Sequence, residues 1–505
     1  MEMLARLANL PGALPGACAQ GLIWGIMAIG VYLTYRILDV ADLTVDGSFG
    51  TGGAVCVMCL LSGQNVWVSL LAAVLAGLAT GLVTGLLHTF MGIPAILSGI
   101  LTQLALYSIN LKIMGKANQS INVDKYDLLI SLRWVKEFAL HNPIIMVILV
   151  SAVVIAVLYW FFGTELGCAI RATGSNPAMS RAQGINTNFN IVLGLAVSNA
   201  LVALSGALLS QYQGFADVGM GRGAIVIGLA AVIIGEAVFG RIFHNFALKM
   251  VSVSLGAIIY YIVIQLVLTL GFDANLLKLL SASVVAVFLA VPYWKGRYFA
   301  KPAAKKANKE TALNGLNLKL NEGDFVTVIG GNGAGKSTML NAVAGVWPVD
   351  CGKIIIDGVD VTRLSEHQRA AYIGRVFQDP MTGTAATMQI EENLALAARR
   401  GKPRTLRIGI TRAEREQYRE LLKSLDLGLE NRLTARVGLL SGGQRQALTL
   451  LMATMNKPKL LLLDEHTAAL DPKTALKVLT LSAKIVAEKH LTTMMLTHTM
   501  KDAIK

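Results

Sequence analysis

A glycine-rich loop followed by lysine and serine carries the clearest chemistry in this chain. Residues 330–337 read GGNGAGKS and match the pattern GxxxxGK[ST] at every position. Glycines let backbone N–H groups turn inward around phosphate oxygens, and the helix that follows adds partial positive charge. Lys336 is expected to reach the β- and γ-phosphates, and the Ser337 hydroxyl to bind Mg²⁺. The residues expected to hold the nucleotide here are Gly330, Asn332, Gly333, Gly335, Lys336, Ser337 and Thr338.

A pair of carboxylates follows a run of four leucines further along the chain. Leu460 to Leu463 predict a buried parallel strand, and Asp464 and Glu465 come directly after it. Asp464 is placed to hold Mg²⁺, usually through water, and Glu465 can polarise an attacking water. An acidic pair after a strand can also be an ordinary loop feature. The glycine-rich loop upstream favours the catalytic interpretation, in which this segment hydrolyses ATP with Mg²⁺ as cofactor.

The elements around the glycine-rich loop have the order that such a site requires. Residues 325–329 read FVTVI and predict a strand, and a helix is expected to begin at the end of the loop. Strand, loop and helix in this order are typical of an α/β P-loop NTPase. We expect this domain to cover residues 311–505.

The rest of the chain has the composition of a membrane protein. The 505 residues have a mean hydropathy of +0.57 and only 15% charged residues. Of 31 Asp and Glu, 11 lie before residue 301 and 20 after it, so the two parts differ in character. The net charge of +14 does not indicate nucleic-acid binding, because no basic stripe with interleaved aromatics accompanies it.

Long apolar runs predict about eight membrane spans within residues 1–297, since a span needs ~20 mostly apolar residues. A shorter apolar piece at 46–63 suggests a broken or re-entrant segment. Gly77, Gly81 and Gly85 recur on one helix face and predict close approach by another helix. The expected spans are 16–36, 66–88, 93–114, 143–162, 189–211, 222–240, 246–271 and 276–293.

The loops between these spans indicate orientation and a contact with the ATPase. Basic residues place residues 163–188 and the segment after 294 in the cytoplasm. A transporter driven from the cytoplasm needs a surface that contacts its ATPase, and the polar loop 163–186, with a short helix after Asn176 and Pro177, is the best candidate. An ordinary solvated loop is the alternative.

Two polar stretches lie beside the spans. Residues 39–53 carry three carboxylates and four glycines, and residues 217–223 again combine glycines with charges. Such residues must face protein or water in a membrane. The first stretch could line a translocation path, form a helix break or cap helices at a cytoplasmic surface, and the second could be its counterpart in an internal repeat.

Five further residues complete a resemblance between residues 311–505 and the nucleotide-binding domain of ATP-binding cassette (ABC) transporters. Residues 440–444 read LSGGQ, which is the signature sequence of that family. The resemblance implies that Ser441, Gly442, Gly443 and Gln444 bind an ATP held by a partner subunit. It also implies that Gln378 contacts Mg²⁺ and senses the membrane domain, that residues 469–471 form the D-loop, and that His498 contacts the γ-phosphate. His466 receives no role.

The membrane part resembles permeases of the branched-chain amino acid and ribose type. The residues that carry this resemblance are 42–48 (DLTVDGS) and 170–177 (IRATGSNP), and with 464–471 (DEHTAALD) they are most similar to tryptophan/tyrosine-type uptake systems of bacteria. In that family the permease and the ATPase are usually separate chains. Here they are fused, and we expect residues 298–310 to be a linker.

The ends of the ATPase segment depart from the family pattern. No aromatic residue lies between Ala300 and Asn321 to stack on adenine, although Tyr298 or Phe299 could substitute. The chain stops seven residues after His498. The segment is therefore expected to be truncated at both ends, and an ATPase-defective fused or truncated membrane protein is one alternative.

The sequence thus predicts a polytopic α-helical membrane domain followed by an α/β P-loop ABC domain. The expected activity is ATP-driven uptake of a small solute, an amino acid, across the bacterial inner membrane, with the ATPase in the cytoplasm. Import of a nucleoside or sugar is an alternative, and export is disfavoured because the permease resembles uptake systems. By resemblance, the partners are a second copy of the chain, an extracytoplasmic solute-binding protein and the lipid bilayer, with no nucleic acid.

Overall fold

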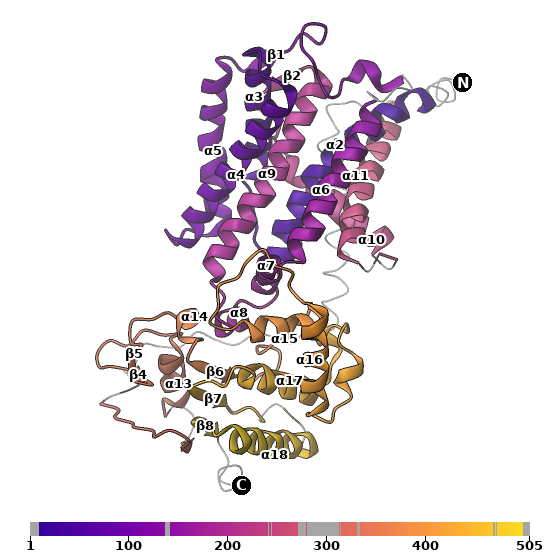
Figure 1. Cartoon of the computed structure of the whole chain (residues 1–505). Helices are drawn as coiled ribbons and strands as arrows, with labels where there is room; N and C mark the ends of the chain where they lie inside the picture. The colour runs from indigo at the N-terminus through magenta and orange to yellow at the C-terminus, as the bar shows by residue number, and fades with distance from the viewer. Residues whose placement is uncertain are drawn as a thin grey trace. The chain divides into compact units, whose positions relative to one another are not determined.

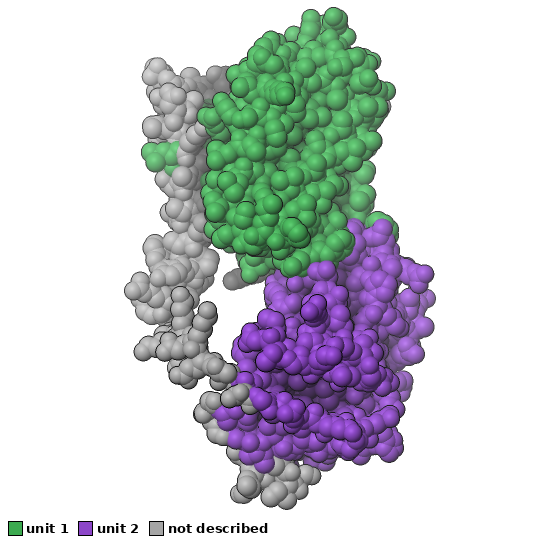
Figure 2. Space-filling view, turned by 90° about the vertical axis from the view of Figure 1, so that its left-hand side faces the viewer, with its two compact units in different colours: residues 1–160, 188–303 green, residues 161–187, 304–505 purple. Residues whose placement is uncertain are grey.

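The computed structural model describes residues 10–136, 142–240, 242–243, 245–270, 279, 313, 315–330, 334–467, 470 and 472–497. The chain divides into two compact units, which Figure 2 shows in two colours. Unit 1 consists of residues 1–160 and 188–303, and unit 2 of residues 161–187 and 304–505. Several expected features lie outside the described residues: most of the span 276–293, the linker with Tyr298 and Phe299, Asn332, Gly333, Ala469, Asp471 and His498.

Unit 1 is a bundle of apolar helices that run alongside one another (Figure 1). Six described helices are long and apolar enough to cross a membrane. Two shorter apolar helices accompany them, and one of these is an unbroken helix where a broken or re-entrant segment was expected. The six are α2 (Leu10–Tyr32, continued by the π-helix η1, Leu33–Leu38), α4 (Val66–Thr89), α5 (Ala95–Met114), α6 (Pro143–Phe162), α9 (Thr187–Gln213) and α11 (Phe246–Thr269), and the two are α3 (Val45–Leu61) and α10 (Ala224–Phe239).

The glycine face of α4 brings α9 into close contact, as the four-residue spacing predicts. A Cβ built on Gly81 would lie 2.3 Å from the carbonyl oxygen of Leu195, and one on Gly77 would lie 2.4 Å from that of Asn199. Gly85 meets Val192 of α9 in the same way, at 2.8 Å. Small residues at these positions therefore allow the two backbones to touch.

The two polar stretches of unit 1 meet one another and cap helices. The Asp46 carboxylate accepts hydrogen bonds from the backbone N–H groups of Gly223 and Ile225, at 2.9 and 3.0 Å, at the start of α10. This satisfies N–H groups that have no partner within the helix. The Asp42 carboxylate is buried and accepts from Asn199 at 2.7 Å. Capping and internal hydrogen bonding therefore account for these two aspartates.

Unit 2 contains a parallel four-stranded sheet in the order β3 (Phe325–Ile329), β8 (Thr493–Thr497), β7 (Leu460–Asp464), β6 (Ile373–Val376). The predicted leucine strand is β7, and its leucines are buried on both faces. Leu460 and Leu462 pack with α13 (Lys336–Ala344), whereas Leu461 and Leu463 pack with α17 (Gly442–Thr454) and α18 (Pro472–Lys489). A strand that is covered on both faces in this way has a continuous hydrophobic sequence.

Further elements complete unit 2 around this sheet. Two short strands, β4 (Ile355–Ile356) and β5 (Val359–Asp360), form an antiparallel hairpin. Helices α15 (Ile390–Ala398) and α16 (Arg412–Lys423) share a hydrophobic core with α17. The segment between the spans α6 and α9 also belongs to this unit and forms α7 (Glu165–Ser175) and α8 (Pro177–Ala182). The short helix predicted after Asn176 and Pro177 is therefore present.

Candidate nucleotide site

The carboxyl end of β7 presents the acidic pair. Glu465 has a left-handed backbone with φ 42° and a side chain that is buried. Gln378 follows the neighbouring strand β6, and its Nε2 donates a hydrogen bond of 3.1 Å to Oε2 of Glu465. Adjacent parallel strands end at the same edge of a sheet, which is why two residues 87 positions apart meet. The structure thus brings together two of the predicted catalytic residues.

An arginine that the motifs did not single out lies against the first carboxylate. The Arg375 guanidinium is 3.7 Å from Oδ2 of Asp464 and 3.8 Å from Oε1 of Glu366, and it donates to Oδ1 of Asn341 at 2.6 Å. It also lies over the ring of Phe377, 4.6 Å from the centroid. A buried cation of this kind compensates the negative charge at the strand end. The only sign in the sequence is an arginine within an apolar strand, IGRV.

Burial shifts the pKa of both Asp464 and Arg375. Burial raises the pKa of Asp464 above its ordinary value, the nearby Arg375 opposes the shift, and Glu465 adds to it. Burial also lowers the pKa of Arg375, while Glu366 and Asp464 oppose that change. Since desolvation disfavours both charged forms, a divalent cation near Asp464 would favour its carboxylate form.

The glycine-rich loop leads into α13 as the motif predicts. Gly335 adopts φ 82° as the N-cap of α13, a conformation that glycine adopts without strain. Lys336 is the first residue of the helix, and its Nζ donates a hydrogen bond to the carbonyl oxygen of Gly330. Ser337 is exposed at this helix start, and Thr338 is half-buried. The geometry leaves the first turn of α13 open to an anion, with Lys336 beside it.

The signature sequence forms the start of α17. Ser441 is the N-cap, and its Oγ accepts from the N–H of Gln444 at 3.3 Å while its own N–H donates to Oε1 of Gln444. These two hydrogen bonds form a capping box, which accounts for Ser441 and Gln444 at the start of the helix. Packing explains Gly443, because a Cβ there would lie 2.0 Å from the Thr474 side chain. Ser441 and Gly442 remain exposed, so this helix start can also meet a phosphate.

The residues around the site fit Mg²⁺ only in company with phosphate. Among the described residues, no group of three or more His, Cys, Asp or Glu side chains could hold a metal by itself. Asp464, Ser337 and Gln378 offer oxygen atoms, which Mg²⁺ prefers, and Mg²⁺ commonly uses one or two carboxylates plus substrate phosphates. The donor set therefore suits Mg²⁺ bound together with a nucleotide.

Residues 163–186 contact the ATPase, as the sequence analysis predicts. The Asn176 amide donates to the carbonyl oxygens of Met381, Thr382 and Thr384, at 3.2, 2.8 and 2.9 Å, in the loop that follows Gln378. Two ion pairs flank it: Arg171 with Glu392, and Arg181 with Glu366, each at 2.8 Å. Cys168, Ala169, Ala172, Met179 and Ile185 pack into the same hydrophobic core as α15 and α17.

Comparisons with known proteins agree with both parts of this architecture. Residues 15–291 match the family model described as the branched-chain amino acid transport system permease component, and residues 313–468 match the model of ABC transporters. The chain is 39% identical over 275 residues to a tyrosine transport system permease protein of Clostridioides difficile, covering 54% of this chain and 88% of the relative.

Two ATP-binding proteins are also similar to this chain. It is 45% identical over 195 residues to a tyrosine transport ATP-binding protein of Clostridioides difficile, covering 39% of this chain and 77% of the relative. It is 38% identical over 195 residues to a methionine import ATP-binding protein of Rhizobium etli, covering 38% of this chain and 51% of the relative. The chain belongs to the family of branched-chain amino acid-type ABC uptake systems, with permease and ATPase in one polypeptide: a multi-pass inner-membrane protein whose cytoplasmic ATPase couples ATP hydrolysis to transport.

Proposed function

We propose that this protein imports an amino acid, with tyrosine as the first candidate. The observation that carries the proposal is that both parts of the chain are similar to components of one kind of system. The permease part is similar to a tyrosine transport permease, and the ATPase part to a tyrosine transport ATP-binding protein. Similarity of the ATPase part to a methionine import protein supports amino acids as the class.

The proposed roles at the site follow from its geometry and from the family resemblance. Glu465 polarises the attacking water, and Gln378, hydrogen-bonded to it, reports the state of the site to the loop that holds Asn176. Gly330, Gly335, Lys336, Ser337 and Thr338, with Asn332 and Gly333, hold the nucleotide phosphates. His498 contacts the γ-phosphate.

Mg²⁺ is the proposed metal cofactor, and Asp464, Ser337 and Gln378 are its proposed ligands. When bound, Mg²⁺ supplies positive charge to the phosphates. Asp464 and Ser337 fix the position of the phosphate groups relative to Glu465. Arg375 compensates the Asp464 charge before nucleotide arrives.

We infer that two copies of the chain form the working unit, with a solute-binding protein outside the membrane. Each copy supplies one glycine-rich loop and one signature helix start. ATP then lies between Lys336 of one copy and Ser441, Gly442, Gly443 and Gln444 of the other. Segment 161–187 passes the closure of the ATPase dimer to the spans. The proposed division of the chain is a membrane domain at 1–297, a linker at 298–310 and the ATPase at 311–505.

Uptake by whole cells tests the substrate. Cells that express this chain together with a solute-binding protein are given radiolabelled tyrosine, with unlabelled tyrosine, tryptophan, methionine, a nucleoside and ribose as competitors. We expect energy-dependent tyrosine accumulation that unlabelled tyrosine, and not ribose or the nucleoside, suppresses. Absence of tyrosine accumulation, or suppression by the nucleoside or the sugar as strong as by unlabelled tyrosine, would overturn the proposed substrate class.

A further inference from the structure

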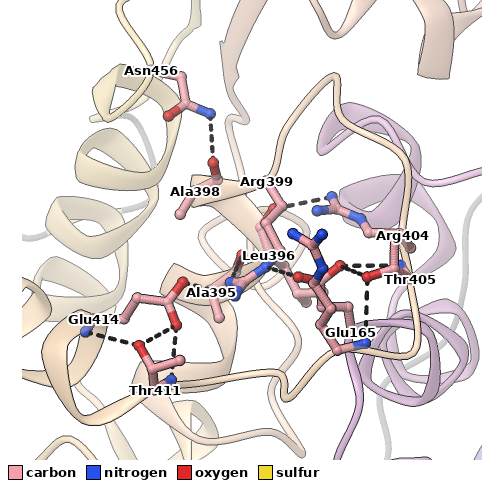
Figure 3. A network of polar contacts seen from close by, with 11 residues as sticks. Glu165, Ala395, Leu396, Ala398, Arg399, Arg404, Thr405, Thr411, Glu414 and Asn456 are labelled. Carbon is pink, nitrogen blue, oxygen red and sulfur yellow. Dashed lines mark hydrogen bonds and ion pairs between the residues drawn. The ribbon is translucent and has the colours of Figure 1, made fainter.

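Glu165 attaches the cytoplasmic segment to the ATPase at a second place, separate from the contact made by Asn176. It is the first residue of α7, and its side chain is only 11% exposed. Oε1 accepts from Nε of Arg399 at 2.8 Å, and Oε2 accepts from both the backbone N–H and the hydroxyl of Thr405 at 3.0 Å (Figure 3). All three of these contacts of the Glu165 carboxylate therefore lie in the ATPase connection between α15 and α16.

The backbone next to Glu165 pairs with the same connection. The N–H groups of Glu165 and Leu166 donate to the carbonyl oxygens of Arg407 and Thr405, at 3.0 and 3.1 Å. In return, the N–H of Gly409 donates to the carbonyl oxygen of Gly163 at 3.0 Å. Thr164 and Ile408 form an antiparallel bridge between the two segments. Residues 163–166, which lead into α7, thus pair with residues 405–409 through backbone hydrogen bonds around a single antiparallel bridge.

Gly409 is required for this pairing to be so close. A Cβ at position 409 would lie 2.9 Å from the carbonyl oxygen of Gly163 and 3.3 Å from the Cys168 sulfur. Gly409 has no positive φ, so close approach and not backbone conformation accounts for the glycine. The ATPase connection is shaped to receive this segment.

Charge makes the attachment specific for a carboxylate. Arg399 bridges Glu165 and Glu414, whose Oε1 accepts from it at 2.7 Å. The nearby Arg404 is half-buried and donates to the carbonyl oxygens of Gln183 and Leu396. Burial and the neighbouring Arg399 lower the pKa of Arg404 to about 10, and Glu165 opposes that shift. For Glu165, burial raises the pKa, but hydrogen bonds from Arg399 and Thr405 outweigh it and lower the pKa overall.

We propose that Glu165 is a positioning residue for coupled transport: clamped by Arg399 and Thr405, it holds residues 163–166 on the 405–409 connection throughout the nucleotide cycle. This rests on the proposed coupling role of segment 161–187. The attachment keeps that segment moving with the ATPase. The Asn176 contact responds to movement of the loop after Gln378. Charge-assisted hydrogen bonds from a guanidinium and paired backbone groups are strong enough for such a task.

Hydrogen–deuterium exchange of the full chain in nanodiscs tests the clamp without any solute. Glu165→Gln should raise amide exchange at residues 163–166 and 405–409 about tenfold, the factor expected when a charged hydrogen bond of ~1.4 kcal/mol is lost. Glu416→Gln is the matched control, because Glu416 pairs with Arg419 on the exposed face of α16. Unchanged exchange in Glu165→Gln, or an equal rise in the control, would overturn the clamp.

A reversible disulfide tests whether the pairing persists. Directly opposed residues of antiparallel strands are close enough for a disulfide, so Thr164→Cys with Ile408→Cys is the pair to use, with the five native cysteines replaced. The oxidised protein should hydrolyse ATP within about twofold of its reduced form, a change worth less than ~0.5 kcal/mol. Loss of hydrolysis on oxidation with recovery on reduction would mean that the pairing opens, which contradicts the proposal.

The amount of tyrosine carried per ATP distinguishes a positioning role of Glu165 from a general effect on stability. In Glu165→Gln, basal ATP hydrolysis should stay within about twofold of wild type, while tyrosine carried per ATP falls about tenfold or more. Equal loss of both would indicate a structural role and overturn the positioning role. If wild-type protein carries no tyrosine, the substrate proposal fails, and the exchange and disulfide results still decide the clamp.

Discussion

At the scale of single residues, the proposed role of Glu465 as the general base can be tested directly. Glu465→Gln keeps the side chain's shape and its contact with Gln378 but removes the base. We expect steady ATP hydrolysis to fall by roughly two to four orders of magnitude, as for loss of a general base, with ATP affinity unchanged. Phosphate release and fluorescent-nucleotide titration on purified protein measure the two quantities. Glu416→Gln, on the exposed face of α16, should change neither. Full turnover in Glu465→Gln would remove the assigned base.

The buried Asp464 gives the site a predicted dependence on pH. Burial raises its pKa, with Arg375 opposing, so its proton competes with Mg²⁺ at higher pH than for an exposed aspartate. Mg²⁺-dependent ATP affinity should therefore be constant near neutral pH and decline as pH falls toward this raised pKa. Titration of Mg²⁺-ATP from pH 8 to pH 5 measures it. Asp464→Asn, which cannot titrate, should show weaker affinity and a flatter profile. An unchanged profile in that variant would exclude Asp464 as the titrating group.

At the scale of elements, the close contact between α4 and α9 leaves no room for a larger residue at position 81. Gly81→Ala places a Cβ 2.3 Å from a backbone oxygen of α9, which cannot move aside as a side chain can. Overpacking of this kind costs about 1–3 kcal/mol, so we expect the melting temperature to fall by roughly 3–10 °C. Gly12→Ala, where a Cβ meets nothing within 4 Å, is the control and should melt like wild type. Unfolding monitored with a thiol-reactive dye, after the exposed Cys351 is replaced, detects this, since Cys56 is buried. Equal melting of both variants would show that α9 can shift.

The elements also show what the sequence could and could not predict. The glycine-rich loop, the leucine strand and the signature helix could be placed because local motif and hydrophobic pattern agree there. The extents of the short helices α3 and α10 were harder to predict, because 17 and 16 residues are marginal for a span and the start of α10 is capped by Asp46, a residue of α3. Arg375 and the pairing of residues 163–166 with 405–409 join positions far apart in the chain. An arginine within the apolar strand IGRV is the only local sign of the first, and no local pattern marks the second, so only the folded structure shows their partners.

At the scale of the whole molecule, the proposed dimer makes a prediction that two matched pairs of chains can decide. If ATP lies between Lys336 of one copy and Ser441 of the other, a mixed dimer of Lys336→Ala with Ser441→Arg keeps one intact site. A mixed dimer of the double variant with wild type keeps none. If instead each copy completes its own site, the outcomes exchange: the first dimer is inactive and the second keeps one site.

Mixed dimers are isolated by sequential purification on two different tags, and their ATP hydrolysis is compared with that of wild-type dimers. We expect measurable hydrolysis, up to about half of the wild-type rate if the two sites act independently, from the first mixture and background from the second. Dimers of each single variant should both be inactive, which shows that each substitution disables the site it touches. Activity in the second mixture with none in the first would contradict a nucleotide shared between copies. The comparison needs no transported solute, because it counts intact sites and not imported molecules. It therefore tests how the fused chain builds its ATPase whatever amino acid the permease accepts.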